Sequence, residues 1–172
     1  MKVRDLLAGA ELRGLAGSPE MDPLTEKDAL QEARLNEVVF DALNMRAGLL
    51  FDLRGALQLR TAYTGLLVLH GVQNLRWHSD RRPTARTAWN VVGSAPFNQD
   101  GVVNLNLFFF PDAEMSVVAR SAAFYAGDVP GLRGTPPDFT GSDQEVAAGM
   151  ASMDSPFEPI QATVIAPFQQ PS

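Results

Sequence analysis

The most specific polar pattern in the chain lies in two alternating segments that flank residues 44–47. NEVVFDAL begins at Asn36 and GLLFDLR begins at Gly48, and their period of two predicts a β-hairpin with a short loop. If residues 45–48 form the turn, Asp41 lies directly opposite Asp52 on the outer face, and the other face turns toward the core. Opposed like charges destabilise a strand pair by a few tenths of a kcal/mol up to about 1 kcal/mol. A pair of this kind therefore calls for a compensating contact or a functional role.

Two further charged side chains accompany these aspartates, so the candidate partner-binding residues are Glu37, Asp41, Asp52 and Arg54. The simplest interpretation is a solvated outer face on which Arg54 screens the pair. The alternatives are a docking surface for a partner protein with a basic surface, or an incidental site for a divalent cation. A hydrolytic carboxylate pair fits least well, because an open hairpin face supplies no cleft.

A second candidate site lies in RWHSDRRPTARTAW, where arginines follow and precede tryptophans. It comprises Arg76, Trp77, Arg81, Arg82 and Arg86. Basic residues interleaved with aromatic ones are typical of single-strand nucleic-acid binding. The net charge of −6, however, has the wrong sign for a nucleic acid or an anionic membrane. We therefore expect a solvated hairpin tip that is open to a phosphate or an acidic partner.

Other chemistry is poorly supported by the sequence. There is no Cys, and the two histidines, His70 and His78, stand in neither an HxH nor an HExxH pattern. GxSxG, GxGxxG and the P-loop pattern do not occur. We therefore expect a non-enzymatic protein without metal or cofactor. The N-terminus lacks the apolar region of a signal peptide, and no apolar run reaches the length of a membrane span, which predicts a soluble, cytoplasmic protein. The Arg-rich, Lys-poor composition indicates a bacterial source.

The helices and strands that must position these residues can be predicted from local patterns, and together they indicate an α+β fold in a single domain over residues 1–172. Residues 1–34 are expected to be helical, with one helix near Val3 and another beginning at Thr25. Residues 35–126 are expected to form the core, a twisted antiparallel sheet or meander of about seven strands, because strand patterns follow one another without helices. Residues 127–172 predict a wrapping Pro-rich acidic extension with a helix opened by Ser142 and a last strand, PIQATVIAP.

The strand VVNLNLFFF predicts one face that is apolar throughout and a second that becomes aromatic only at its end, at Phe108 and Phe110. We expect cover for that end from the chain itself, with a homodimer contact or an apolar ligand pocket near these two residues as alternatives. The predicted core comprises Phe40, Phe51, Leu53, Leu66, Val68, Leu105, Leu107 and Phe109.

The stretch from Leu35 to Trp77, with LLFDLR and LVLHGVQNLRW as its most distinctive segments, resembles the strand succession of small, uncharacterised bacterial proteins. Some of those are immunity proteins of toxin systems. The resemblance covers about a quarter of the chain and implies no catalytic residue. It favours a non-enzymatic protein-binding domain of the immunity or inhibitor type, and the alternative is a small-molecule binding module with an apolar pocket near Phe108 and Phe110.

Overall fold

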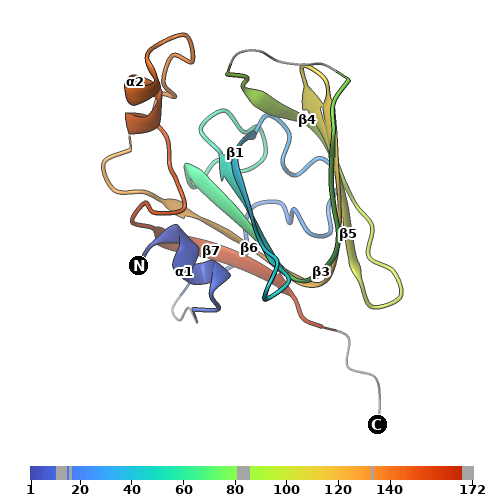
Figure 1. The fold of residues 1–172 in the computed structure, drawn as a ribbon. Helices are drawn as coiled ribbons and strands as arrows, with labels where there is room; N and C mark the ends of the chain where they lie inside the picture. Colours follow the sequence, from blue (N-terminus) through green and yellow to red (C-terminus); the bar gives the residue numbers. More distant parts are fainter. Residues whose placement is uncertain (11–14, 16, 81–85, 133, 168–172) are drawn as a thin grey trace.

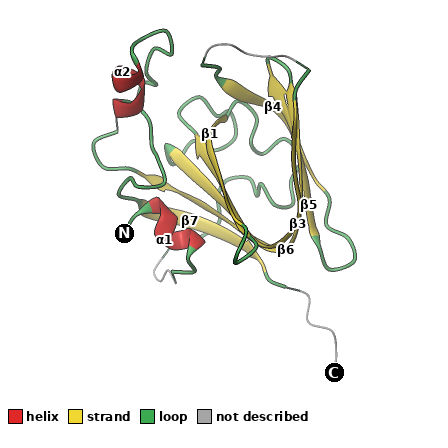
Figure 2. Cartoon of the chain, viewed as in Figure 1, coloured by secondary structure: helices red, strands yellow, loops and turns green. Residues whose placement is uncertain are grey.

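Seven antiparallel strands dominate the protein (Figures 1 and 2). The computed structural model describes residues 1–10, 15, 17–80, 86–132 and 134–167. The strands are β1 (Arg34–Asp41), β2 (Arg46–Asp52), β3 (Thr64–His78), β4 (Trp89–Pro96), β5 (Val103–Phe110), β6 (Ala113–Asp128) and β7 (Glu158–Ile165). The helices of the described residues are short: α1 (Val3–Leu7) and α2 (Asp143–Ala148). The predicted antiparallel sheet of seven strands is thus confirmed.

The sheet closes on itself into a barrel. Its strand order is β3-β2-β1-β4-β5-β6-β7, and an additional β3–β6 pairing joins its two halves. The two longest strands make this closure, from Thr64↔Gly127 to His78↔Glu114. On the other edge of β6, β5 pairs with Ala113–Ala119 and β7 with Ala122–Asp128.

The seam between β1 and β4 is the weak point of the barrel. These strands pair only at Arg34↔Asn90 and Leu35↔Trp89. β1 continues beyond that contact, with a bulge at Asn36, and residues 37–41 pair with β2 on their other side. The barrel wall is therefore incomplete next to β1.

Apolar side chains fill two layers. The barrel core lies inside the sheet and includes Phe51, Leu67, Leu105, Phe109 and Phe124. The outer core lies between the other face of the sheet and the segments that cover it, and it comprises Val3, Leu6, Leu50, Leu66, Val68, Val129, Ala151, Met153 and Phe157. Gly48 in β2 leaves room for Leu7 of α1, which a Cβ there would overlap.

The prediction of one contiguous core is therefore wrong, because those predicted residues that are buried fall into two separate clusters. Leu66 and Val68 belong to the outer core, whereas Phe51, Leu53, Leu105, Leu107 and Phe109 belong to the barrel core. Phe40 belongs to neither, because its side chain faces the incomplete part of the wall and is 46% exposed.

The helix expected from Thr25 does not form. Residues 23–32 are a series of turns in which Asp28 and Glu32 adopt φ values of 61° and 64°. The segment instead bonds to the edge of β4, with Asp28 N–H to Ser94 O at 2.8 Å and Glu32 N–H to Val91 O at 2.8 Å. These bonds satisfy the edge of β4, and the turns bury Leu24 and Leu30 in the barrel core. Tertiary hydrogen bonding thus overrides local helix propensity here.

Candidate functional site: the open mouth of the barrel

The β1–β2 hairpin has a different register from the predicted one. Its turn covers residues 42–45 rather than 45–48, so Asp41 pairs with Arg46 and Asp52 pairs with Arg34. The predicted opposition of Asp41 and Asp52 is wrong. Asn44 explains the earlier turn, because its backbone N–H and side-chain Nδ2 donate to the Asp41 carboxylate at 3.2 and 2.8 Å. These bonds hold the pKa of Asp41 below its ordinary value.

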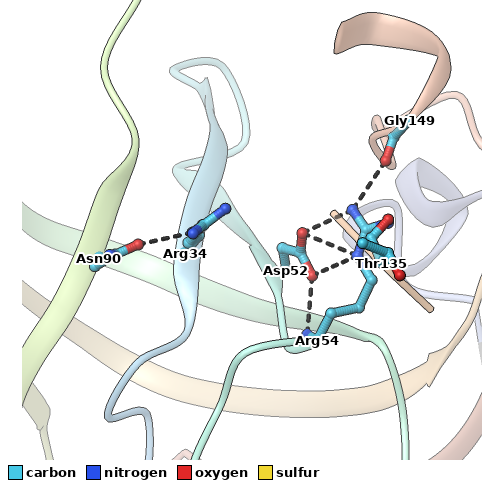
Figure 3. Close-up of polar contacts among 6 residues, drawn as sticks. All are labelled: Arg34, Asp52, Arg54, Asn90, Thr135 and Gly149. Atoms are coloured by element: carbon cyan, nitrogen blue, oxygen red, sulfur yellow. Dashed lines mark hydrogen bonds and ion pairs between the residues drawn. The ribbon is translucent and has the colours of Figure 1, made fainter. Parts of the chain in front are cut away.

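Asp52 and Arg54 form a buried ion pair on the outer face of β2 (Figure 3). Their side chains are 3% and 1% exposed, and the Arg54 Nη2 lies 2.7 Å from Asp52 Oδ2. The guanidinium also donates to Gly149 O at 2.8 Å and Thr135 O at 3.2 Å. These contacts fasten β2 to the segments on both sides of α2. A solvated face screened by Arg54 is therefore not what the structure shows.

Glu37 is occupied as well, because its carboxylate accepts the Met153 backbone N–H at 3.1 Å. Glu37 and Asp41 thus bond to different groups from those that hold Asp52 and Arg54. The four predicted residues lie on the outer side of one hairpin but do not form one open acidic patch.

The residues of the predicted arginine site do not lie together either. Arg76 pairs with Ser116 on the outer face, whereas Trp77 pairs with Met115, which is buried in the barrel core. Arg86 donates to Phe139 O at 2.9 Å and contacts the Asp143 carboxylate, so it binds the region of α2. Arg81 and Arg82 lie outside the described residues.

A cavity of about 430 Å³ opens where the barrel wall is incomplete, and we call it the mouth cavity. It is lined by Leu35, Asn36, Glu37, Val38, Leu75, Trp77, Trp89 and Met115. The two tryptophan rings meet edge to face, with centroids 5.0 Å apart, and Trp77 lies 5.2 Å from the Phe109 ring. Both tryptophans of the chain therefore line one apolar space.

The β1 side of the mouth cavity leaves apolar surface open to solvent. Val38 pairs with Leu49 and Phe40 with Ala47, both barrel-core residues, so Val38 and Phe40 face inward. Val38 is nevertheless 39% exposed, because the β1–β4 pairing ends at Leu35 and no other described strand lies beside it on that edge. The Nδ2 of Asn36 is buried and has no hydrogen-bond partner among the described residues. Sequence reasoning missed this site, although two tryptophans flanking one connection were an available signal.

The aromatic end of β5 is not covered by the described part of the chain. Phe108 and Phe110 point outward and are 43% and 62% exposed, so the expectation of internal cover is wrong. Phe108 borders a pocket of about 200 Å³ whose other walls are mainly polar: Arg76, His78, Asn106, Glu114, Met115 and Ser116. A pocket thus lies beside Phe108, but it is lined mainly by polar residues, and the more apolar mouth cavity lies on the Phe109 side of the sheet.

The histidines have separate surroundings. Burial, with a smaller contribution from Arg46, holds the pKa of His70 below its ordinary value. The Nε2 of His78 lies 3.1 Å from Asp80 Oδ1. Across the described ranges, no three His, Cys, Asp or Glu side chains are grouped as metal ligands would be. The helices described are too short or too polar to cross a membrane.

Comparison with known proteins adds one distant structural similarity. No family model matches the chain, and no curated protein matches it. A crystal structure of an uncharacterized protein from Neisseria gonorrhoeae can be superposed with a TM-score of 0.41 and 11% sequence identity. The superposition covers 55% of this chain and 90% of that one.

Proposed function

We propose that the protein is a non-enzymatic binding protein that takes a small apolar molecule, or an apolar group of a larger one, into the mouth cavity. The observation that carries this proposal is the joint lining of one open cavity by Trp77, Trp89 and Val38. Small-molecule sites are characteristically concave, mostly apolar, and found in the mouths of β-barrels.

The size of the cavity fits this function. Its volume of about 430 Å³ falls within the range of roughly 300–1,000 Å³ typical of ligand sites. An edge-to-face tryptophan pair offers ring surfaces for stacking, and offset or edge-on contacts between rings add about 0.5–1.5 kcal/mol beyond burial alone. An aromatic or compact aliphatic group is therefore the preferred occupant.

The exposed apolar surface supplies the driving force. Val38, Phe40 and Trp77 leave inward-facing surface in contact with solvent. Covering apolar surface is favourable by about 25 cal/mol per Å². The charged groups nearby do not oppose this, because the Glu37 carboxylate is bonded to the Met153 N–H.

N-Phenyl-1-naphthylamine, a neutral dye that brightens in apolar surroundings, tests the proposal. Energy transfer from tryptophan to bound dye should be strong, because both tryptophans line the cavity. Val38→Asp places a carboxylate in the wall and should weaken dye binding by about tenfold or more. Val92→Asp is the matched control, since Val92 is an exposed β4 valine (47%) that does not line the cavity. Equal weakening by both substitutions, or by neither, contradicts the proposal.

Protein binding of the immunity or inhibitor type is the second candidate, and the outer surface of β4 and β5 favours it. Val92 of β4 and Phe108 and Phe110 of β5 are exposed there, and Phe97 is exposed just beyond the end of β4. Contiguous exposed apolar surface commonly marks a protein contact. Sedimentation velocity of the wild type and Phe110→Ser tests the homodimer form of this candidate: a dimer that Phe110→Ser dissociates supports it, and a wild-type monomer at about 100 μM rules that form out.

A further inference from the structure

Among the described residues, the edge of β1 that faces away from β2 has no strand partner beyond Leu35. Residues 37–41 pair with β2 on one side, whereas pairing with β4 ends at Leu35. No described residue donates to or accepts from the other edge of residues 36–41. A strand edge of this kind presents a row of N–H and C=O groups in a fixed alternation.

The mouth cavity runs along this edge. Four consecutive β1 residues, Leu35 to Val38, line it. β1 is bulged between Leu35 and Glu37, and beyond the bulge Glu37 pairs with Leu50 of the outer core whereas Val38 pairs with Leu49 of the barrel core. Glu37 and Val38 therefore point to opposite faces, and a cavity that both of them line borders the edge of the strand. A group that enters the cavity therefore comes beside the unpaired backbone groups.

The central part of this edge, residues 38–40, carries no charge or proline, and no described segment pairs with it. Its central residues are Val38, Val39 and Phe40, with Glu37 and Asp41 bonded on the outer side. Native proteins normally blunt an exposed edge with charges, prolines or a covering segment. An apolar strand edge that lies open beside a cavity can pair with a strand of another protein.

From these features we infer that the natural occupant is an extended segment of a partner protein, which adds a strand to β1 and places an apolar side chain in the mouth cavity. Backbone pairing supplies affinity and the cavity supplies side-chain preference, as in other cases of strand addition. A small molecule can fill the cavity but cannot satisfy the row of backbone groups. The inference rests on the proposed function, because it uses the same cavity.

A tethered peptide tests the inference without requiring a known partner. The chain has no cysteine, so Leu43→Cys gives a single attachment point at the fully exposed hairpin turn. The peptide Cys-Gly-Gly-Thr-Val-Thr-Phe-Thr-Val-amide, joined through a disulfide, then lies at a millimolar effective concentration beside β1. Two N-methylated versions of the peptide serve as controls. One version is methylated at every second backbone nitrogen of the strand-forming part, and the other is methylated at the nitrogens in between; each set is called an N-methyl frame.

Hydrogen exchange of the β1 amides and transfer from tryptophan to N-phenyl-1-naphthylamine are the readouts. We expect the unmodified peptide to slow exchange of edge-facing amides within residues 36–41 by at least about tenfold and to displace the dye. One N-methyl frame should abolish this protection and the other should retain it, because only alternate donors face the edge.

Each contrary result has a distinct meaning. If neither frame changes protection, or if the peptide gives none while the dye still binds in a Val38-dependent manner, strand addition is wrong and the cavity function stands. If the dye does not bind in the mouth cavity of the untethered protein, the proposed function fails instead. If wild-type protein dimerises through β1, with the same amides protected in the dimer, a second copy replaces the separate partner and the inference is overturned.

Discussion

The two faces of the β1–β2 hairpin reverse the usual distribution of charge and apolar surface. On the outer face, Asp52 and Arg54 are buried under the segments that flank α2. On the inner face, Val38 and Phe40 are apolar but exposed. The outer charges can be buried because they bond to each other and because Arg54 also bonds to backbone oxygens of the segments that flank α2. The inner apolar residues are exposed because the pairing of β1 with β4 ends at Leu35.

This difference separates stability from function. The outer face joins distant parts of the chain, and breaking its contacts should lower the free energy of unfolding. The exposed part of the inner face, Val38 and Phe40 of β1, adds little to folding, because these side chains are only partly removed from water. Its exposed surface can instead be covered by a ligand.

Breaking the buried pair should have the largest effect. Arg54→Met leaves the Asp52 carboxylate buried without its cation, and we expect the free energy of unfolding to fall by about 3–5 kcal/mol. Urea denaturation measures this loss. The double variant Asp52→Leu/Arg54→Met should recover a substantial part of it, because no lone charge remains. A single variant within about 1 kcal/mol of wild type would show that the pair is not held as described.

Two adjacent phenylalanines of β5 allow a buried and an exposed side chain to be compared within one strand. Phe109 is buried in the barrel core, so Phe109→Ala should cost about 3–5 kcal/mol of unfolding free energy. Phe110→Ala should cost less than about 1 kcal/mol, because that ring is mostly exposed. Thermal and urea denaturation of the two variants check this order. Equal losses would mean that the β5 register is wrong.

Phe40 tests whether the exposed inner side chains of β1 are dispensable for folding. Phe40→Ser should change the free energy of unfolding by no more than about 1 kcal/mol, whereas Phe51→Ala on the neighbouring strand should cost about 3–5 kcal/mol. Chemical denaturation of both variants gives the comparison. A large loss for Phe40→Ser would place this ring in the core, as the sequence alone predicts.

The smallest effect concerns pH. The pKa of His70 is lowered in the folded protein, so below pH about 6.5 the unfolded chain binds the proton more readily than the folded one. The contribution of His70 is therefore fully present above that pH and is lost as the pH falls toward the lowered pKa. His70→Gln should flatten the loss of stability on acidification. Parallel stability curves for wild type and variant would contradict the assigned shift.

Local patterns of the chain predict the strands well. Alternation identifies β1 to β7, and Asp100-Gly101 predicts the β4–β5 turn, where both residues have positive φ values of 56° and 77°. The Ser142–Glu145 capping box predicts α2, and its reciprocal hydrogen bonds are present. These features depend on neighbours in the sequence, so the sequence reveals them.

Features that depend on distant residues are predicted poorly. The observed turn over residues 42–45 differs by three residues from the predicted turn over residues 45–48, and this shift changes the partners of Asp41 and Asp52. The mouth cavity depends on where β4 stops pairing with β1, which no local pattern encodes. Of the site residues predicted from the sequence, two line the mouth cavity: Trp77 in its inner wall and Glu37 at its rim.

The most direct test of the mouth cavity uses the two tryptophans as separate reporters. Protein labelled with 5-fluorotryptophan should give two ¹⁹F resonances, one from Trp77 and one from Trp89. On titration with toluene, we predict that both resonances shift together and saturate at one common dissociation constant. Val38→Asp should weaken both responses, and Val92→Asp should leave them unchanged. If toluene binds but neither resonance moves, the ligand site lies elsewhere and the mouth cavity is not the binding site.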